Sequence, residues 1–268
     1  MRHSRHPLWK FGRFLRDANF SHFVVSVVVI LVIWSITSAT IDNPGRYLPS
    51  PLAVALSSVD MLYKGILPSY FADTIRRLVL GSIIGLSLGI PFGLLLGLNR
   101  TISDMFYPLL NFFQSISGIA IFPIIVIWWG NSDKTVLAIV LYTSFFPLAY
   151  TVLSGVREVP MKYIHAVRTL GATRFQVIRD VLLPGAMPSI VTGTRLSISF
   201  AWRAVIAGEM LAGREGLGWM IFTGQDADLT TQVILGMLMI GCSWIILDHY
   251  LLRPLEMDTI ERWGLVQR

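Results

Sequence analysis

Long runs without a charged residue divide this sequence, and each run is long enough to cross a bilayer as a helix. About 20 helical residues cross the roughly 30 Å of hydrocarbon in a membrane. A sixth run, 188–211, is apolar but carries Arg195, Arg203 and Glu209, which we expect to face protein or water. The pattern predicts an all-α integral membrane protein with six transmembrane helices, of which the first is a retained anchor. The five charge-free runs are 23–41, 78–98, 105–132, 135–156 and 229–247.

Glycines recur at every fourth position of the second predicted span, at Gly81, Gly85, Gly89, Gly93 and Gly97. Four residues turn a helix by about 400°, so the stripe drifts slowly and leaves a groove without side chains. Small residues allow helices to approach closely in a membrane. We therefore expect this groove to pack against another helix of the same chain, with a subunit interface as the alternative. Pro91 predicts a kink in the same span.

Composition agrees with a membrane protein and narrows the possible functions. Hydrophobic residues make up 54% of the 268 residues and charged residues only 14%, against about 25% charged in an average soluble domain. The single cysteine, Cys242, excludes a disulfide within one chain and a multi-cysteine metal site. The net charge of +6 is compatible with nucleic acid or with a membrane, so the position of the basic residues decides between them.

Lys and Arg gather in the segments that lie inside if the N-terminus is cytoplasmic. Those segments hold 14 basic residues and the outer segments hold 6, which predicts both termini in the cytoplasm. A Leu-Pro-Ser-Pro run at 48–51 predicts extended chain, followed by a short amphipathic helix over 52–64. The predicted order is a basic cytoplasmic segment 1–22, the anchor 23–41, a periplasmic segment 42–77, a core 78–247 with an inner loop 157–187, and a cytoplasmic tail 248–268.

The inner loop has the pattern of two short helices joined at a corner. Pro160 suits the start of the first helix, and Gly171 suits the left-handed residue that ends it. Thr173 and Gln176 have the spacing of a capping box that opens the second helix, and Pro184 is expected to end that helix. Each helix would carry an apolar face, which predicts docking on the membrane domain or on a partner; lying on the lipid surface is the alternative. The two faces are Ile164, Val167 and Leu170, then Phe175, Ile178 and Leu182.

Residues 160–184 resemble the cytoplasmic EAA loop of bacterial ABC-importer permeases. The loop departs from the family pattern at two positions, because His165 stands where the family usually has Glu and Val167 where it has Ala. The matching residues are Ala166, Gly171, Leu183 and Pro184. Four further segments resemble the nitrate/sulfonate/taurine branch of these permeases, at 48–51, 201–203, 208–211 and 216–218.

This resemblance implies a type I ABC-importer permease fold in the bacterial inner membrane, working by alternating access. It implies as partners a second permease copy in a homodimer, two ATP-binding-cassette ATPase subunits inside, and a periplasmic or lipid-anchored solute-binding protein outside. His165 replaces a fixed negative charge with a group near neutrality at pH 7, so we expect coupling to depend on the shape of the loop more than on this charge. The implied ATPase-coupling residues are His165, Ala166, Val167, Gly171, Ala172, Thr173, Phe175, Leu183 and Pro184.

The sequence contains no motif for covalent chemistry of its own. No G-x-x-x-x-G-K-[ST] occurs, so we expect this chain to bind no cofactor and to leave ATP and Mg²⁺ to partner subunits. The five histidines form no H-E-x-x-H, and no G-x-S-x-G occurs, which argues against a metal site or a membrane-embedded hydrolase. The alternative function is a secondary transporter or channel without an ATPase partner. That alternative predicts repeated halves, but the glycine stripe has no counterpart in the second half.

Polar residues inside the predicted spans are candidates for a translocation path. Arg203 and Glu209 are six residues apart, or about 120° around a regular helix, so they do not form a simple ion pair. We expect Arg203 to offer positive potential to a small anionic solute; the alternative is a structural ion pair with another helix or a second subunit. Nitrate, sulfonates, taurine, bicarbonate, aromatic acids and vitamin precursors all stay open as substrates. The path candidates are Arg203, Glu209, Gln114 and Ser117, with Ser115 as a further polar residue.

Overall fold

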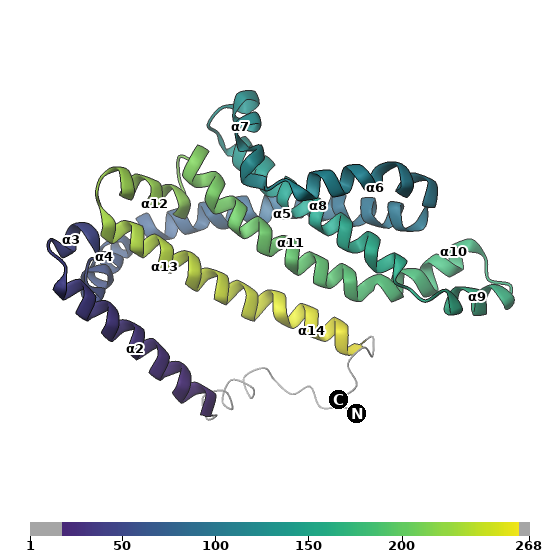
Figure 1. Ribbon diagram of the computed structural model, residues 1–268, viewed down its shortest axis with the longest axis horizontal. Coiled ribbons are helices and arrows are strands. Elements are labelled where there is room, and N and C mark those ends of the chain that lie inside the picture. Colours follow the sequence, from purple (N-terminus) through teal and green to yellow (C-terminus); the bar gives the residue numbers. More distant parts are fainter. Residues whose placement is uncertain (1–17, 263–268) are drawn as a thin grey trace.

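The computed structural model describes residues 18–262, and every regular element among them is a helix (Figure 1). Residues 1–17 of the predicted N-terminal segment and 263–268 of the predicted tail lie outside the described residues. The elements are α2 (Ala18–Thr40), α3 (Pro44–Tyr47), α4 (Pro51–Tyr63), α5 (Ile66–Leu98), α6 (Arg100–Ser115), α7 (Gly118–Trp129), α8 (Asp133–Arg157), α9 (Met161–Thr169), α10 (Arg174–Val177), the π-helix η1 (Ile178–Leu182), α11 (Leu183–Ala212), α12 (Leu217–Asp226), α13 (Thr230–Leu247), the π-helix η2 (Asp248–Leu252) and α14 (Arg253–Arg262).

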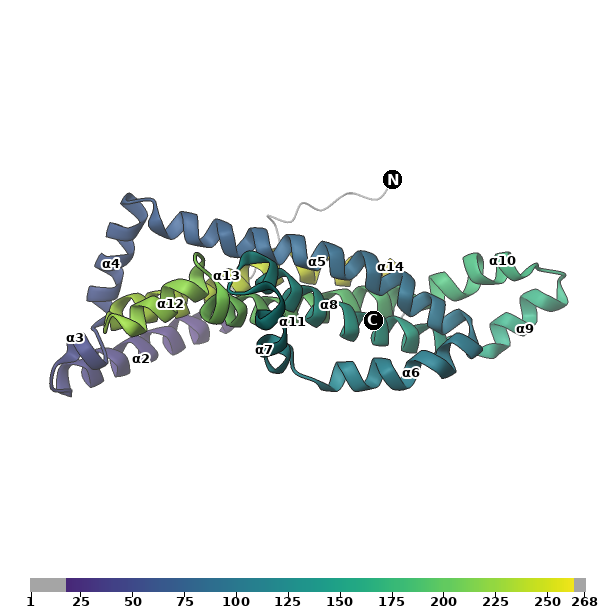
Figure 2. The ribbon, with the colours of Figure 1, turned by 90° about the horizontal axis from the view of Figure 1, so that it is seen from above.

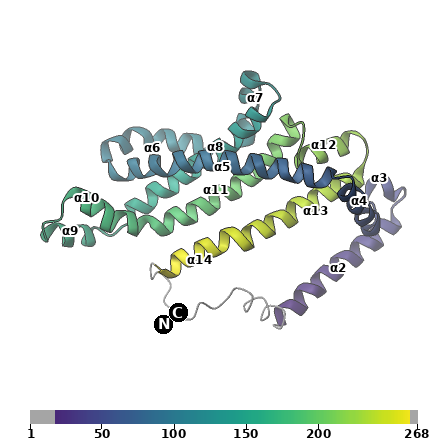
Figure 3. The same ribbon diagram turned by 180° about the vertical axis from the view of Figure 1, so that it is seen from behind.

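Three long helices, α5, α8 and α11, form the centre of the molecule, and α8 packs along both of the others. Their shared core includes Leu78, Val140 and Val205, which are all buried. The chain from α13 through η2 to α14 runs beside α11, whereas α2 diverges from the bundle (Figures 1 and 3). The paired helices α9 and α10 project from the end of the molecule opposite α3 and α4 (Figure 2).

The glycine stripe packs against α8, which confirms close packing within the chain. A Cβ on Gly81 would lie 2.8 Å from the Cβ of Val140, and one on Gly93 would lie 2.7 Å from the Cβ of Val152. Such distances leave no room for a side chain on this face of α5. Helix α5 continues through Pro91 without interruption.

The predicted span over 105–132 is wrong as one straight helix. The chain breaks between α6 and α7, whose axes are bent by 94°. Extended backbone at Ile116 and Ser117 makes the break, and the hydroxyl of Tyr142 donates hydrogen bonds to the carbonyls of Phe113 and Ile116. A run of apolar residues shows that a segment lies in apolar surroundings, but it does not show whether the helix is straight or broken.

Length and composition support fewer spans than the sequence predicts. Within the described residues, α5, α8 and the helix over Thr230–Met257 are long and apolar enough to cross a membrane, and the bent α6–α7 pair would make a fourth. The described apolar part of α2, Val24–Thr40, is shorter than the 18 residues required of a span here. Helix α11 is long, but it carries Arg195, Arg203 and Glu209. The count of six spans therefore stays a prediction.

The corner between α9 and α10 has the predicted geometry. Pro160 directly precedes α9, and Gly171 has a left-handed φ of 86°. The backbone N–H of Thr173 donates to Oε1 of Gln176 at 2.8 Å, and the N–H of Gln176 donates back to Oγ1 of Thr173 at 3.4 Å. This reciprocal capping box confirms the predicted start of the second helix.

The prediction that Pro184 ends this second helix is wrong. Helix α10, η1 and α11 follow one another without a break, and both Pro184 and Pro188 lie inside α11. The N–H of Leu183 donates to the carbonyl of Ile178, five residues back, as in a π turn. We infer that this wider turn accommodates Pro184, because a proline clashes with the carbonyl four residues earlier in a regular helix. The corner is thereby joined to the long helix α11.

The segment between α2 and the bundle has the predicted short helix. Helix α4 begins directly after Ser50, whose side chain accepts a hydrogen bond from the N–H of Ala53 at 3.2 Å. The next helix, α5, begins at Ile66, before the charge-free run at Leu78. Arg77 therefore lies within α5, where it contributes to the buried ion-pair network described below.

Candidate functional site

A cleft of about 350 Å³ opens where α6 breaks into α7, between this bend, α8 and α11. Three of the predicted path residues, Gln114, Ser117 and Arg203, line it together. They come from segments far apart in the sequence, and the bend places the end of α6 opposite the middle of α11. Its aromatic lining is Phe113, Tyr142, Phe146 and Phe200.

Aromatic contacts and one hydroxyl hold the bend beside this cleft. The rings of Phe113 and Phe146 stack with their centroids 5.2 Å apart, and the ring centroid of Tyr142 lies 4.8 Å from that of Phe146. The hydroxyl of Tyr142 also donates to the carbonyl of Ile116 at the break and to that of Phe113, which accepts a second bond from the N–H of Ile116. The hydroxyl of Ser115 instead donates a hydrogen bond to the carbonyl of Asn111, four residues earlier in α6, at 2.8 Å.

Arg203 is exposed in the cleft, and its guanidinium lies 5.9 Å from the ring centroid of Phe200. Among the described residues it has no hydrogen bond or ion pair, in contrast to the other arginine of α11. Arg195 forms an ion pair of 2.9 Å with Asp248 and a second with Glu256. The positive charge of Arg203 is thus available to a ligand.

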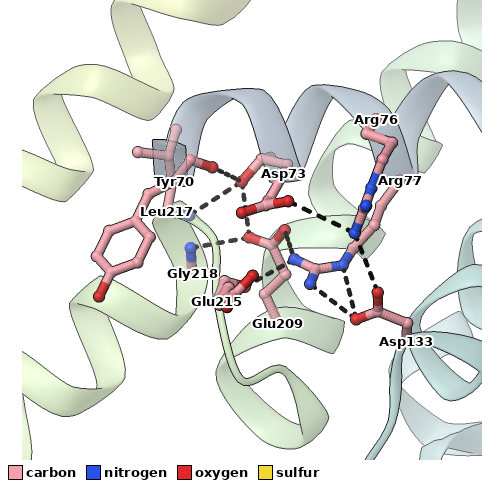
Figure 4. A network of polar contacts seen from close by, with 10 residues as sticks. Tyr70, Asp73, Arg76, Arg77, Asp133, Glu209, Glu215, Leu217 and Gly218 are labelled. Atoms are coloured by element: carbon pink, nitrogen blue, oxygen red, sulfur yellow. Dashed lines mark hydrogen bonds and ion pairs between the residues drawn. The ribbon is translucent and has the colours of Figure 1, made fainter. Parts of the chain in front are cut away.

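Glu209 lies outside the cleft, in a buried network of polar contacts (Figure 4). Its Oε1 accepts from Nη1 of Arg77 at 2.9 Å, and its Oε2 accepts from Oγ1 of Thr74 at 2.9 Å and from the N–H of Gly218 at 3.0 Å. A wholly buried carboxylate needs such partners. In the structure Glu209 therefore connects helices, whereas the sequence analysis placed it among the candidates for the translocation path.

The guanidinium of Arg77 joins several elements at once. It donates to Asp133 at the start of α8, at 2.7 and 3.1 Å, and to the carbonyl of Glu215 at 2.7 Å, besides its bond to Glu209. Gly216 has a φ of 114°, and a Cβ there would meet the Glu209 carboxylate. Sequence reasoning missed this network. The sequence did contain a signal for this network, because a glutamate inside an apolar span needs a cation as its partner and Arg77 directly precedes the charge-free run 78–98.

The loop between α8 and α11 exposes an apolar surface far from the cleft. Leu170 is 87% exposed and Phe175 is 69% exposed, whereas Ile164 on α9 and Val177 on α10 are buried. The predicted coupling residues divide in the same way. Val167, Ala172 and Pro184 are half-buried, and the exposed ones are His165, Ala166, Gly171, Thr173, Phe175 and Leu183. A compact unit with exposed apolar side chains at its tip is suited to contact another protein.

No group of three or more His, Cys, Asp or Glu residues within the described ranges is arranged to hold a metal ion. Arg77 and Arg195 are paired with acidic residues of the same chain, so they connect its helices. The cleft and the α9–α10 surface are thus the two features left as candidates for function.

Comparisons with known proteins point to transport. Residues 89–251 match the family described as "Binding-protein-dependent transport system inner membrane component". The chain is 28% identical over 251 residues to the taurine transport system permease protein TauC of Escherichia coli, covering 92% of this chain and 90% of that protein. It is 26% identical to the nitrate import permease protein NrtB of Synechocystis sp., covering 85% of each. A chain from crystal structures of the MetNI methionine ABC transporter has a similar fold, with a TM-score of 0.55 at 20% identity over 77% of this chain and 98% of that one.

Proposed function

The chain belongs to the family of inner-membrane components of binding-protein-dependent transport systems, and on that premise we propose that two copies of it form one path for a small anionic solute. The chain is a permease of an ABC importer, in the branch that includes permeases for taurine and nitrate. It is a multi-pass membrane protein, and membership in this family implies an ATPase partner and a solute-binding partner.

The α9–α10 unit of each copy is the proposed docking site for one of two ATP-binding-cassette subunits. The observation that carries this proposal is its exposed apolar tip, with Leu170 and Phe175, on a corner fixed by a capping box. A force applied to such a compact unit passes into α11, because the helix continues through η1. The unit is on the cytoplasmic side in this proposal, with both termini inside and six helices crossing the membrane.

The cleft at the α6–α7 bend is the proposed part of the path that this chain contributes. Gln114, Ser117 and Arg203 meet there, and Arg203, which has no acidic partner within residues 18–262, favours an anion. The solute's affinity would differ between an inward-open and an outward-open state, as alternating access requires. The solutes named for the relatives, taurine and nitrate, are small and each carries an anionic group.

The remaining partners follow from this assembly. A periplasmic or lipid-anchored binding protein delivers the solute at the end that holds α3 and α4. The ATPase subunits bind ATP and Mg²⁺ and carry out hydrolysis, so this chain itself is non-catalytic and holds no cofactor. The alternative, a secondary transporter or channel, needs no ATPase and therefore differs in what the chain binds.

Co-purification tests this proposal. We expect an affinity-tagged chain, extracted from its own membranes in mild detergent, to bring down an ABC ATPase. Replacing Leu170 with serine should remove most of that ATPase, because it deletes an apolar contact at the centre of the tip. The matched control is Leu52→Ser on α4, a side chain that is also exposed but lies at the opposite end. The proposal fails if no ATPase is recovered, or if both variants lose it equally.

A further inference from the structure

We infer that the cleft at the α6–α7 bend binds an organic anion that carries an aromatic ring, such as an arylsulfonate or an aryl carboxylate. This solute class rests on the proposed path and adds to it the chemistry of what passes through. Two features of the cleft lead to it: an arginine that has no acidic partner in the described part of the chain, and a lining rich in aromatic rings.

Arg203 supplies the site for the anionic group. Arg77 and Arg195 each have two carboxylate partners, whereas Arg203 has no hydrogen bond or ion pair within the described residues and lies with its guanidinium over the ring of Phe200. Unpaired charges inside apolar helices are costly and mark ligand or ion pathways. A guanidinium matches the paired oxygens of a carboxylate or a sulfonate with two parallel N–H bonds.

Aromatic rings supply the site for the body of the solute. Phe113, Tyr142 and Phe146 form a continuous cluster on one wall, with centroids 5.2 and 4.8 Å apart, and Phe200 adds a ring beside Arg203. Rings gain from edge-to-face and offset contacts with other rings beyond the burial of apolar area. A mostly apolar cleft of about 350 Å³ with few polar groups has the character of a site for a small organic ligand.

The aromatic side of the same lining offers nothing to a small inorganic anion. Nitrate or bicarbonate carries acceptor oxygens on every side, so burying it requires donors all around. The hydroxyls of Tyr142 and Thr143 already donate to backbone carbonyls. Apart from Arg203, the donors left in the lining are the side chains of Gln114 and Ser117 and the backbone N–H groups of Gly118 and Ile119 in the first turn of α7. An aromatic anion needs donors only at its charged end.

Ligand binding to the intact complex tests this inference. The permease–ATPase complex in lipid nanodiscs is titrated with benzenesulfonate or with methanesulfonate, which has the same charged group but no ring, and saturation-transfer NMR reports each affinity. We expect benzenesulfonate to bind at least about tenfold more tightly than methanesulfonate. Arg203→Gln should weaken benzenesulfonate about tenfold, and Phe146→Leu about threefold. Arg214→Gln, an exposed arginine in the α11–α12 turn, should change nothing.

The outcomes separate the solute class from the transport assignment. Each variant is used only if it co-purifies with the ATPase and hydrolyses ATP, which shows that it is folded and assembled. If no ATPase assembles, the proposed function itself fails. If the complex hydrolyses ATP but binds methanesulfonate as tightly as benzenesulfonate, or gives no signal with benzenesulfonate, or is unaffected by Arg203→Gln, the aromatic-anion inference is overturned.

Discussion

Arg77 and Arg203 show how the same side chain serves two purposes in one bundle. The side chain of Arg77 is only 3% exposed and makes ion pairs with Glu209 and Asp133, so its charge is used within the chain. Arg203 is exposed in the cleft and is unpaired among the residues that the structure describes. Burial and partners, rather than residue type, therefore separate a structural arginine from a ligand-binding one.

Removing the charge of Arg77 should destabilise the protein strongly. In Arg77→Leu the carboxylate of Glu209 stays buried without its cation, and breaking a buried pair from one side costs about 3–5 kcal/mol. The neighbouring Arg76 is 54% exposed at its side chain, so Arg76→Leu should cost less than about 1 kcal/mol. Thermal unfolding of the detergent-solubilised protein, followed by size-exclusion chromatography, compares the two.

A second substitution checks the cause of that loss. Changing Glu209 to Gln in the Arg77→Leu background removes the unpaired charge, so it should restore part of the lost thermal stability. Equal effects of Arg77→Leu and Arg76→Leu, or a double variant that is less stable than Arg77→Leu, would contradict the role assigned to this network.

At the scale of elements, local patterns predicted more than long runs did. The corner at Gly171 and the capping box of Thr173 and Gln176 depend on neighbouring residues only, so the sequence contained what was needed to predict them. The break at Ile116 depends on the hydroxyl of Tyr142, which lies on another helix. The pair of Arg77 and Glu209 spans 132 positions. Contacts of this kind are set by tertiary packing, and one sequence carries no direct record of them.

The α5–α8 contact gives a prediction at this scale. A Cβ on Gly85 would lie 2.9 Å from the Cβ of Ser144, so Gly85→Leu should push the two central helices apart. Overpacking of this kind typically costs about 1–3 kcal/mol, and we expect a lower unfolding temperature and less recovered protein. The control is Gly241→Leu on α13, where nothing lies within 4 Å. Equal unfolding temperatures for both variants would show that the close contact is not required.

At the scale of the whole molecule, α11 connects the features described above. One end joins the α9–α10 unit through η1, and Arg195 ties its first half to η2 and α14. Its middle carries Arg203 into the cleft, and Glu209 fixes its far end to α5. Because a helix is stiff along its axis, a displacement of the α9–α10 unit would reach the cleft through this one element. Such an arrangement fits the transport of a solute driven by a partner at a distance.

The shape of the α9–α10 corner, rather than its charge, should determine this transmission. Gly171 has a φ of 86°, a conformation that costs other residues about 1–2 kcal/mol, so Gly171→Leu should distort the corner and abolish transport-linked ATP hydrolysis or prevent assembly. Gly171→Asn should retain most activity, because Asn tolerates this conformation. His165→Ala leaves the corner intact and should keep most of the transport rate. Reconstituted proteoliposomes with the ATPase and the binding protein give both rates. Full transport by Gly171→Leu would show that the geometry of the corner is not required. A His165→Ala complex that assembles but loses nearly all transport-linked turnover would show that the side chain at position 165 is required.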